Sequence, residues 1–386
     1  MKTLIELYDE RPLENVLATQ IFKPDTTVFI SRRDTAADTG LHARMKEYMR
    51  QRGVETELVF AGTDTYQPAK ILETMRGICA VYEDCAMDIT GGSEAALFAA
   101  GRLSAETQIP VFTYSRKQNR FFDISNASFA TEAVCDMHLT ISQILSMAGG
   151  AMRTGRVDNA LLMPYLDAVP AFFELYLKNR KGWVRFITWM QEASQLSQTQ
   201  VDAKRILRGD HGSRLAADPV ILDGLQKIGW ILDLSFDEEK VRFGFLDMQV
   251  REWLRDIGSV LELYVYFIAR KTGLFDDVRL SVIARWDANE SAKRDAVSNE
   301  IDVMMTCGVI PYFISCKTGE IHTEALNELA ILRDRFGGEM AKAAIVSGQK
   351  ANAAVRNRAV ELGIRVFDLE DLQKNRLEKR IAAMVK

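Results

Sequence analysis

The first 115 residues alternate between strand signals and helix signals, and this alternation constrains the fold more than any other feature. Short apolar runs such as 26–31 (TTVFIS) and 86–90 (AMDIT) predict buried strands, whereas 41–53 and 94–104 have the length and composition of helices. Strands that alternate with helices form parallel sheets with helices on both faces. We therefore expect a Rossmann-like α/β domain, but without the GxGxxG fingerprint after its first strand, which disfavours NAD binding.

The pattern changes twice after this half. Residues 151–245 contain apolar segments of helical length, such as PAFFELYLKNRKGWVRFITWM, and we expect a helical connector there. From residue 246 the signals become helix (250–273), strand (276–286), two strands (300–305 and 310–317), helix (323–338) and strand (342–348). This order predicts a second compact α/β domain over 246–386.

Composition excludes several classes of protein. A net charge of -4 over 386 residues argues against a uniformly basic surface that coats nucleic acid. The five cysteines are odd in number and scattered through apolar runs, as in reduced cytoplasmic proteins, and none has the CxxC spacing of a structural zinc site. No apolar run reaches the roughly 20 residues of a membrane span.

A candidate catalytic site lies in the segment VSNEIDVMMTCGVIPYFISCKTG, residues 297–319. Asp302 stands at the start of one apolar strand, and Ser315 and Lys317 share a face of the next strand. Glu262, at the edge of a helical apolar stripe, can turn toward the same place. Two carboxylates suit Mg²⁺ or Mn²⁺, and a lysine can orient a water or support a charged transition state. This set favours metal-assisted phosphodiester cleavage over solvated charges at the ends of a hairpin.

A candidate binding site for a polyanion lies at the ends of the N-terminal strands. Ligands of open α/β sheets bind outside the carboxyl ends of the strands, where small residues let a ligand approach the backbone. The residues at these ends are Tyr8, Asp9 and Glu10, then Ser31, Arg32 and Arg33, then Thr90, Gly91, Gly92 and Ser93, and then Ser115, Arg116 and Lys117. Free N–H groups at the start of the helix after Ser93 can also bind anions.

The C-terminal half resembles the PD-(D/E)xK nuclease fold, on the pieces VLELYVY, NEIDV and ISCKTG. The resemblance gives Glu262, Asp302 and Lys317 the metal-binding and catalytic roles. Ser315 departs from the pattern, which has an acid two residues before the lysine. Glu300, Glu262 or the backbone carbonyl of Cys316 would then supply the missing metal ligand, and Glu300 is the nearest because it shares a strand face with Asp302.

The N-terminal half resembles the CARF domain, on the stretches ELYDERPLENVLA and ITGGS. Together the halves resemble the CRISPR ancillary nucleases, in which a CARF domain (here 1–150) is joined to a PD-(D/E)xK domain (here 246–386). The resemblance implies a homodimer that binds cyclic tetra-adenylate across its CARF interface. It also implies a cytoplasmic effector of type III CRISPR systems that, with Mn²⁺ or Mg²⁺, cuts single-stranded DNA, RNA or supercoiled DNA.

Two alternatives remain open from the sequence. The chain could be a CARF-type sensor or transcriptional regulator with an inactive nuclease fold, which Ser315 favours and which Asp302 and Lys317 oppose. It could instead be a restriction-type endonuclease whose N-terminal domain only recognises DNA. On either nuclease hypothesis, the polar segment 287–298 is expected to be a mobile element that closes over the substrate.

Overall fold

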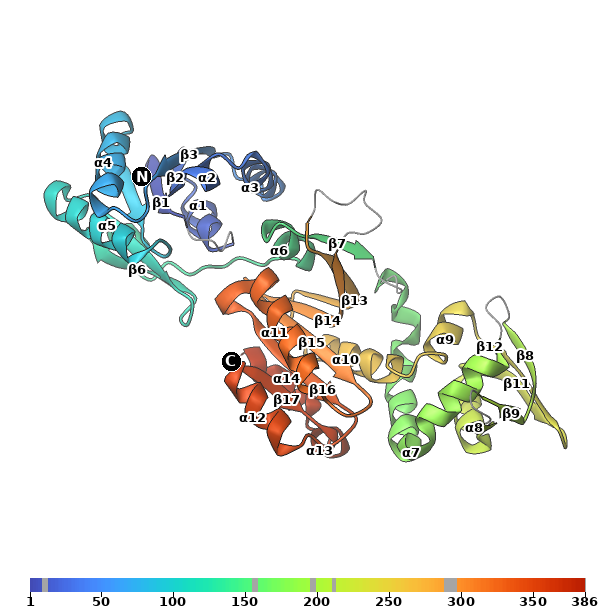
Figure 1. Ribbon diagram of the computed structural model, residues 1–386. Helices are drawn as coiled ribbons and strands as arrows, with labels where there is room; N and C mark the ends of the chain where they lie inside the picture. Colours follow the sequence, from blue (N-terminus) through green and yellow to red (C-terminus); the bar gives the residue numbers. More distant parts are fainter. Residues whose placement is uncertain (9–12, 155–158, 195–198, 210–212, 288–296, 386) are drawn as a thin grey trace. The chain divides into compact units, whose positions relative to one another are not determined.

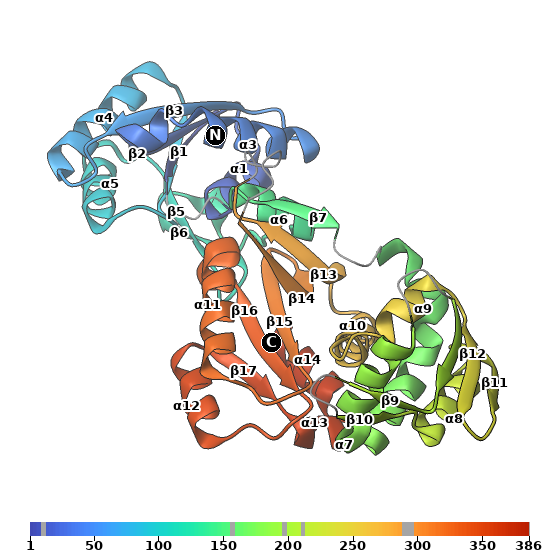
Figure 2. The same cartoon turned by 45° about the vertical axis from the view of Figure 1, so that its right-hand side comes forward.

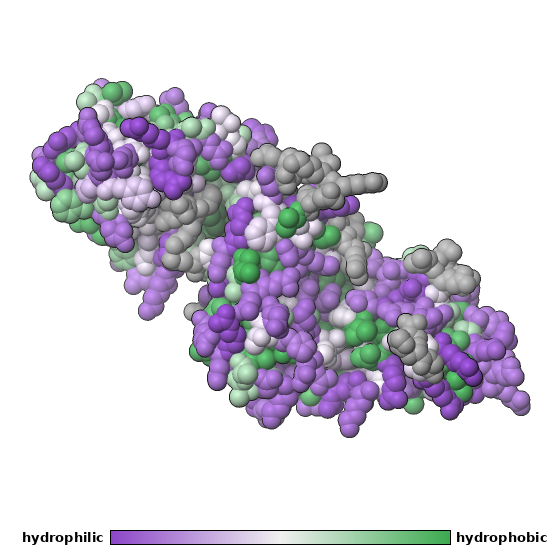
Figure 3. Space-filling model, in the orientation of Figure 1, coloured by the Kyte–Doolittle hydropathy of each residue, from purple (hydrophilic) through white to green (hydrophobic). Residues whose placement is uncertain are grey.

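The computed structural model describes residues 1–8, 13–154, 159–194, 199–209, 213–287 and 297–385. The chain divides into two compact units. The first unit comprises 1–152, 284–298 and 334–340, and the second comprises 153–283, 299–333 and 341–386. Hydrophilic residues cover most of the face seen in Figure 3. No helix of the described residues is long and apolar enough to cross a membrane.

The first unit is built on a six-stranded sheet in the order β3-β2-β1-β4-β5-β6. Its strands are β1 (Thr3–Leu7), β2 (Thr26–Arg32), β3 (Glu57–Thr63), β4 (Cys85–Asp88), β5 (Val111–Ser115) and β6 (Arg120–Ser125). The first five run parallel, and only β6 pairs antiparallel, with β5. The predicted Rossmann-like alternation is therefore confirmed, although the sequence did not predict β6.

Helices cover both faces of this sheet (Figures 1 and 2). They are η1 (Glu14–Val16), α1 (Leu17–Phe22), α2 (Arg33–Ala36), α3 (Thr39–Gln51), α4 (Pro68–Val81), α5 (Glu94–Thr107) and η2 (Ser128–Ala130). Helix α6 (Ile141–Met147) packs against α3 instead of against the sheet. Helices α4 and α5 pack against alternate strand residues such as Val28 and Val111. Phe112 points to the opposite face, where Phe22 of α1 contacts its ring edge to face.

The expected helical connector contains strands as well as helices. Its elements are β7 (Ala151–Thr154), η3 (Asn159–Leu161), η4 (Met163–Ala168), α7 (Val169–Ala193), β8 (Gln200–Lys204), β9 (Ile206–Arg208), β10 (Arg214–Ala216), α8 (Pro219–Ile228), β11 (Ile231–Phe236) and β12 (Lys240–Phe245). Strands β11, β12 and β8 form one small sheet, and β10 pairs with β9. Asp237 closes the β11–β12 hairpin by accepting hydrogen bonds from the backbone N–H groups of Glu239 and Lys240. Such a side-chain turn gives the backbone an alternative to the helix.

The C-terminal sheet has the order β17-β16-β15-β14-β13-β7. Its elements after residue 245 are α9 (Met248–Trp253), α10 (Ser259–Thr272), β13 (Asp277–Arg285), β14 (Ser298–Cys307), β15 (Ile310–Lys317), α11 (Thr323–Gly337), η6 (Gly338–Met340), β16 (Lys342–Ser347), α12 (Ala353–Glu361), β17 (Ile364–Phe367), α13 (Leu369–Gln373) and α14 (Leu377–Val385). Strand β14 pairs antiparallel with β15, whereas β16 and β17 continue parallel to β15. The predicted order of helix, three strands, helix and strand is thus present.

One expectation for this half is wrong: 250–273 is not a single helix. Helix α9 ends at Trp253 and α10 begins at Ser259. The carboxylate of Asp256 accepts hydrogen bonds from the Ser259 hydroxyl (2.8 Å) and the Gly258 N–H (3.4 Å). This local bonding competes with a continuous helix, and it places Glu262 in the first turn of α10.

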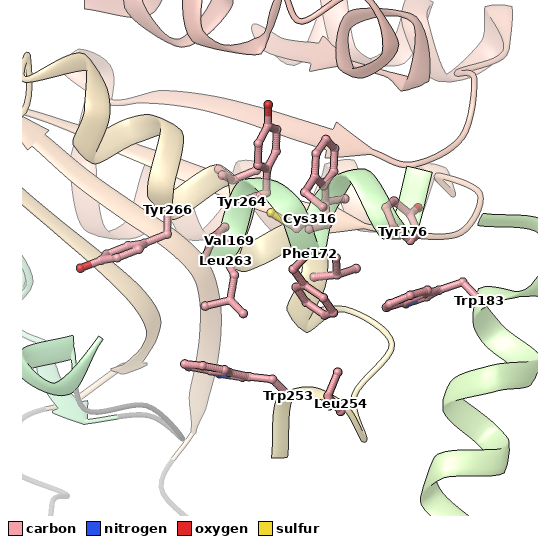
Figure 4. Close-up of a cluster of buried hydrophobic side chains, with 14 of the residues drawn as sticks. Val169, Phe172, Tyr176, Trp183, Trp253, Leu254, Leu263, Tyr264, Tyr266 and Cys316 are labelled. Carbon is pink, nitrogen blue, oxygen red and sulfur yellow. The ribbon is translucent and has the colours of Figure 1, made fainter. Parts of the chain in front are cut away.

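The core of the second unit lies where α7 and α10 pack against β15. Figure 4 shows the aromatic side chains of both helices gathered with the sulfur of Cys316. The rings of Phe173 and Tyr264 stack with centroids 3.6 Å apart. Burial of these apolar surfaces fixes α10 on the sheet, which in turn fixes the position of Glu262.

Candidate functional site

The nuclease-like site is built on the neighbouring strands β14 and β15. Asp302 Oδ2 accepts a hydrogen bond from the backbone N–H of Cys316 (2.6 Å) and one from the Ser315 hydroxyl (3.2 Å). Ser315 and Lys317 line one pocket together with Glu300 and Asp302, as expected from the alternation of strand side chains. Ser315 therefore orients the neighbouring aspartate, a role that the sequence pattern did not suggest.

Glu262 approaches this group from α10. A Cβ atom on Gly258 would lie only 2.6 Å from Glu262 Oε1, so glycine leaves the space that the carboxylate needs. Burial, together with the nearby carboxylates of Asp302, Asp256 and Glu300, raises the pKa of Glu262 to about 8, against the opposing charge of Lys317. Burial also raises the pKa of Asp302, although the Cys316 N–H, Lys317 and Ser315 stabilise its charged form.

Glu300 lies two residues before Asp302 on β14 and shares a strand face with it. Its carboxylate forms a hydrogen bond with the hydroxyl of Ser281 on β13. Across the pocket, Glu328 of α11 accepts a hydrogen bond from the side-chain amide of Asn299 (3.1 Å). The sequence did not single out Ser281, Asp256 or Glu328, because their proximity to the site depends on tertiary contacts between separate elements.

The donor chemistry of this group fits a hard divalent cation. Glu262 and Asp302 are partly buried acids with raised pKa values, and a cation would offset the repulsion between them. Within the described residues, no group of three or more His, Cys, Asp or Glu side chains is arranged to hold a metal ion. When a metal binds, Glu262 and Asp302 would consequently have to be joined by further oxygen ligands that are not already gathered around them. The Cys316 thiol is buried in the core of Figure 4, so only its backbone carbonyl could be such a ligand.

The candidate binding site for a polyanion lies at one edge of the sheet of the first unit. Because β1, β2, β4 and β5 are parallel, their carboxyl ends meet at one edge of the sheet. The structure thus brings the ends after Leu7, Arg32, Asp88 and Ser115 to this edge. The backbone N–H of Tyr8 bonds to the Ile30 carbonyl (3.0 Å). Asp9 and Glu10 lie outside the described residues, as does most of the segment 287–298.

Several of the predicted binding residues already have partners within the fold. Arg32 pairs with Asp34 (2.5 Å) on the surface, and Arg116 pairs with the buried carboxylate of Glu14. The hydroxyl of buried Ser31 contacts the carbonyl of Arg32, whereas Arg33 is exposed at the start of α2.

The loop after β4 is held by local contacts. Thr90 donates its backbone N–H to Asp88 (2.8 Å) and accepts a hydrogen bond from the Tyr114 N–H (2.8 Å). Ser93 caps α5 through the Ala96 N–H (3.3 Å), the ordinary structural role of a serine at this position. Gly92 has φ of +92°, and a Cβ there would lie 2.9 Å from Leu7 Cβ. Glycine is therefore required at 92 by the fold, apart from any ligand, whereas Gly91 is the buried small residue beside it.

A buried acidic pair beneath this edge was missed by the sequence analysis. Glu6 of β1 and Asp88 of β4 are partners in the parallel register and are each 1% exposed. Burial raises the pKa of Glu6 well above its usual range and that of Asp88 to about 7. The only signal in the sequence was an acid inside each apolar run, in LIEL and AMDIT.

The fold and the site define a class of protein in which a Rossmann-like domain precedes a restriction-endonuclease-like α/β domain. The model of the Card1-like endonuclease domain matches residues 249–384. This match supports an endonuclease activity for the C-terminal domain, and it confirms the resemblance to CRISPR-associated nucleases. No curated protein sequence matches the chain significantly.

Two solved structures share the fold over nearly the whole chain. One is the protein VC1899 from Vibrio cholerae, with a TM-score of 0.76 and 17% identity over 99% of this chain and 98% of that one. The other is Can2 from Sulfobacillus thermosulfidooxidans in complex with cyclic tetra-adenylate, with a TM-score of 0.73 and 18% identity over 98% and 99% of the two chains.

Proposed function

We propose that this protein is a metal-dependent endonuclease that is allosterically activated by cyclic tetra-adenylate and serves as an accessory effector of type III CRISPR systems. The observation that carries the proposal is the pocket on β14 and β15, which gathers Asp302, Ser315 and Lys317 within a domain matched by the Card1-like endonuclease model. The fold shared with Can2, whose structure contains cyclic tetra-adenylate, supports the choice of activator.

Asp302 and Glu262 would hold Mn²⁺ or Mg²⁺ in this site, with the carbonyl of Cys316 as a further oxygen ligand. A bound ion of this kind lowers the pKa of a water molecule and stabilises charge on a phosphate. Ser315 and the Cys316 N–H keep the Asp302 carboxylate in one orientation. The ammonium group of Lys317, on the same strand face as Ser315, would orient the attacking water or support the charge that develops on the phosphate.

Each part of the chain has a role in this proposal. Residues 1–150 form a CARF-like domain, 151–245 connect it to the nuclease, and 246–386 form the PD-(D/E)xK domain. Two copies of the chain assemble as a homodimer, so that equivalent loops meet equivalent phosphates of a symmetric activator. The exposed Arg33 and Ser93, with the partly exposed Ser115, would form the side of the site that is open to that ligand. The substrates are single-stranded DNA, RNA or supercoiled DNA in the cytoplasm.

A second candidate is a CARF-type sensor or transcriptional regulator whose nuclease fold is inactive. The observation that favours it is Ser315, because a serine hydroxyl supplies no charged ligand at a position where the PD-(D/E)xK pattern has an acid. On this hypothesis the protein binds cyclic tetra-adenylate but cuts nothing.

Cleavage assays separate these candidates. Single-stranded DNA, RNA and supercoiled plasmid are incubated with the protein and Mn²⁺ or Mg²⁺, with and without cyclic tetra-adenylate. We expect cleavage only when metal and activator are both present, and cleavage by Lys317→Ala that is slower by about 100-fold or more. Activator binding without cleavage under any condition would support the inactive sensor. Cleavage that is independent of the activator would refute the allosteric part of the proposal.

A further inference from the structure

Strand β13 contains a local distortion beside the nuclease-like site. Ser281 has φ of +54°, in the left-handed region that a non-glycine residue rarely adopts within a strand. The alternation of burial also breaks here, because Leu280, Ser281 and Val282 are all buried. An irregularity of this type re-aims a side chain and is common next to active sites. Buried Ser281 is thus turned toward a direction that a regular strand would not give it.

The side-chain amide of Asn159 holds the backbone at this distortion. Its Oδ1 accepts a hydrogen bond from the Leu280 N–H (2.7 Å), and its Nδ2 donates one to the Leu280 carbonyl (3.0 Å). The amide therefore bonds both backbone groups of Leu280, as a residue of a neighbouring strand would. Asn159 belongs to η3, more than one hundred residues earlier in the chain, so the arrangement exists only in the folded protein.

From its position in the distorted part of β13, the hydroxyl of Ser281 donates a hydrogen bond to the carboxylate of Glu300. Glu300 is exposed, and an exposed glutamate otherwise samples several rotamers at little cost. The bond ties one carboxylate oxygen to β13 and leaves the other available in the pocket that Asp302 and Lys317 line. A carboxylate fixed there also raises the pKa values of Glu262 and Asp302.

We infer that Asn159 and Ser281 are positioning residues that fix Glu300 as the carboxylate replacing the acid absent at Ser315. This inference rests on the proposed metal-dependent nuclease and assigns the missing oxygen ligand to one side chain. Groups that orient a metal ligand typically change metal affinity by about 10- to 100-fold when they are removed. The series of contacts from Asn159 through the backbone of Leu280 and the hydroxyl of Ser281 would orient Glu300 as a metal ligand.

The test compares the affinity of the full-length protein for Mn²⁺, measured by titration calorimetry, in wild type, Ser281→Gly, Glu300→Ala and the double variant. Glycine adopts φ of +54° without strain, so Ser281→Gly removes the hydroxyl and keeps the backbone. Ser235→Gly, an exposed serine beside the irregularity of β11, is the matched control. Asn159→Ala provides a second variant that acts through the backbone of Leu280.

We expect Ser281→Gly to raise the Kd for Mn²⁺ about tenfold, with the melting temperature and activator affinity unchanged. The same substitution should have no further effect in the Glu300→Ala protein, because its action passes through that carboxylate. An unchanged Kd in Ser281→Gly would overturn the inference, and so would an equal loss in the Glu300→Ala background. Absence of Mn²⁺ binding by the wild-type protein would instead overturn the proposed function, and this inference with it.

Discussion

The buried carboxyl group of Asp88 makes the stability of the first unit depend on pH. Asp88 accepts hydrogen bonds from Thr90 through Oδ1, but its other oxygen has no hydrogen-bond partner among the described residues. Burial raises its pKa from 3.8 to about 7. The folded protein therefore keeps this proton over a pH range in which the unfolded chain has released it.

The sign of the effect follows from the two pKa values. Because the folded-state pKa is the higher one, the contribution to stability is complete below pH 3.8 and is lost as the pH rises to about 7. Well inside this interval each pH unit changes the free energy of unfolding by about 1.4 kcal/mol, and the slope falls as Asp88 ionises near pH 7, so we expect a loss of about 2 kcal/mol between pH 5 and pH 7. Glu6, whose pKa is also raised, contributes in the same direction.

Asp88→Asn removes the titrating group and keeps an oxygen that can accept the hydrogen bonds of Thr90. Between pH 5 and pH 7 the free energy of unfolding of the variant should fall by about 2 kcal/mol less than that of the wild type. It should therefore be the more stable protein at pH 8. Asp25→Asn, an exposed acid in the same unit, is the control and should follow the wild type.

Hydrogen exchange of the amides in β1 and β4, corrected for the intrinsic effect of pH, measures the relevant free energy. Tryptophan fluorescence is a poorer measure of it, because the Rossmann-like sheet contains no tryptophan and the first unit has a single one, Trp286, outside that sheet. An identical pH dependence in Asp88→Asn and wild type would refute the reasoning, since the proton would then not be retained on Asp88.

Three further predictions concern single positions. Lys317→Ala should lower kcat for cleavage about 100-fold or more and leave activator affinity unchanged in a binding assay; normal turnover would exclude the lysine from the chemistry. Ser315→Asp should lower the Kd for Mn²⁺ roughly tenfold, because it adds a charged ligand, and a weaker affinity would show that Asp302 needs the serine more than the metal needs an acid. Gly92→Ala should destabilise the first unit by about 1–2 kcal/mol, since φ of +92° is strained for alanine. Its control is Gly101→Ala in α5, where a Cβ meets no atom within 4 Å; equal melting temperatures of the two variants would contradict this account.

Local sequence signals determined the order of most elements. The alternation of apolar runs and helical segments predicted the parallel sheet of the first unit, because each strand and helix forms from residues close in the chain. The same signals predicted β14 and β15 and the shared face of Ser315 and Lys317, because strand side chains alternate. They failed where side-chain hydrogen bonds override propensity, as Asp256 does between α9 and α10.

Only the tertiary structure decided which of the candidate residues have other partners. The sequence predicted Arg116 to be a ligand-binding cation, yet it pairs with the buried Glu14, about one hundred residues away. The sequence predicted Gly92 to belong to an anion-binding loop, yet its packing against Leu7 requires a glycine there. In the sequence Ser315 stands where the pattern has a metal-binding acid, yet its hydroxyl donates a hydrogen bond to Asp302. Glu300 accepts a hydrogen bond from Ser281 on another strand. The sequence by itself determines the strands and the chemical groups at their ends. The contacts that fix those groups in space join residues far apart in the chain, so only the folded protein reveals them.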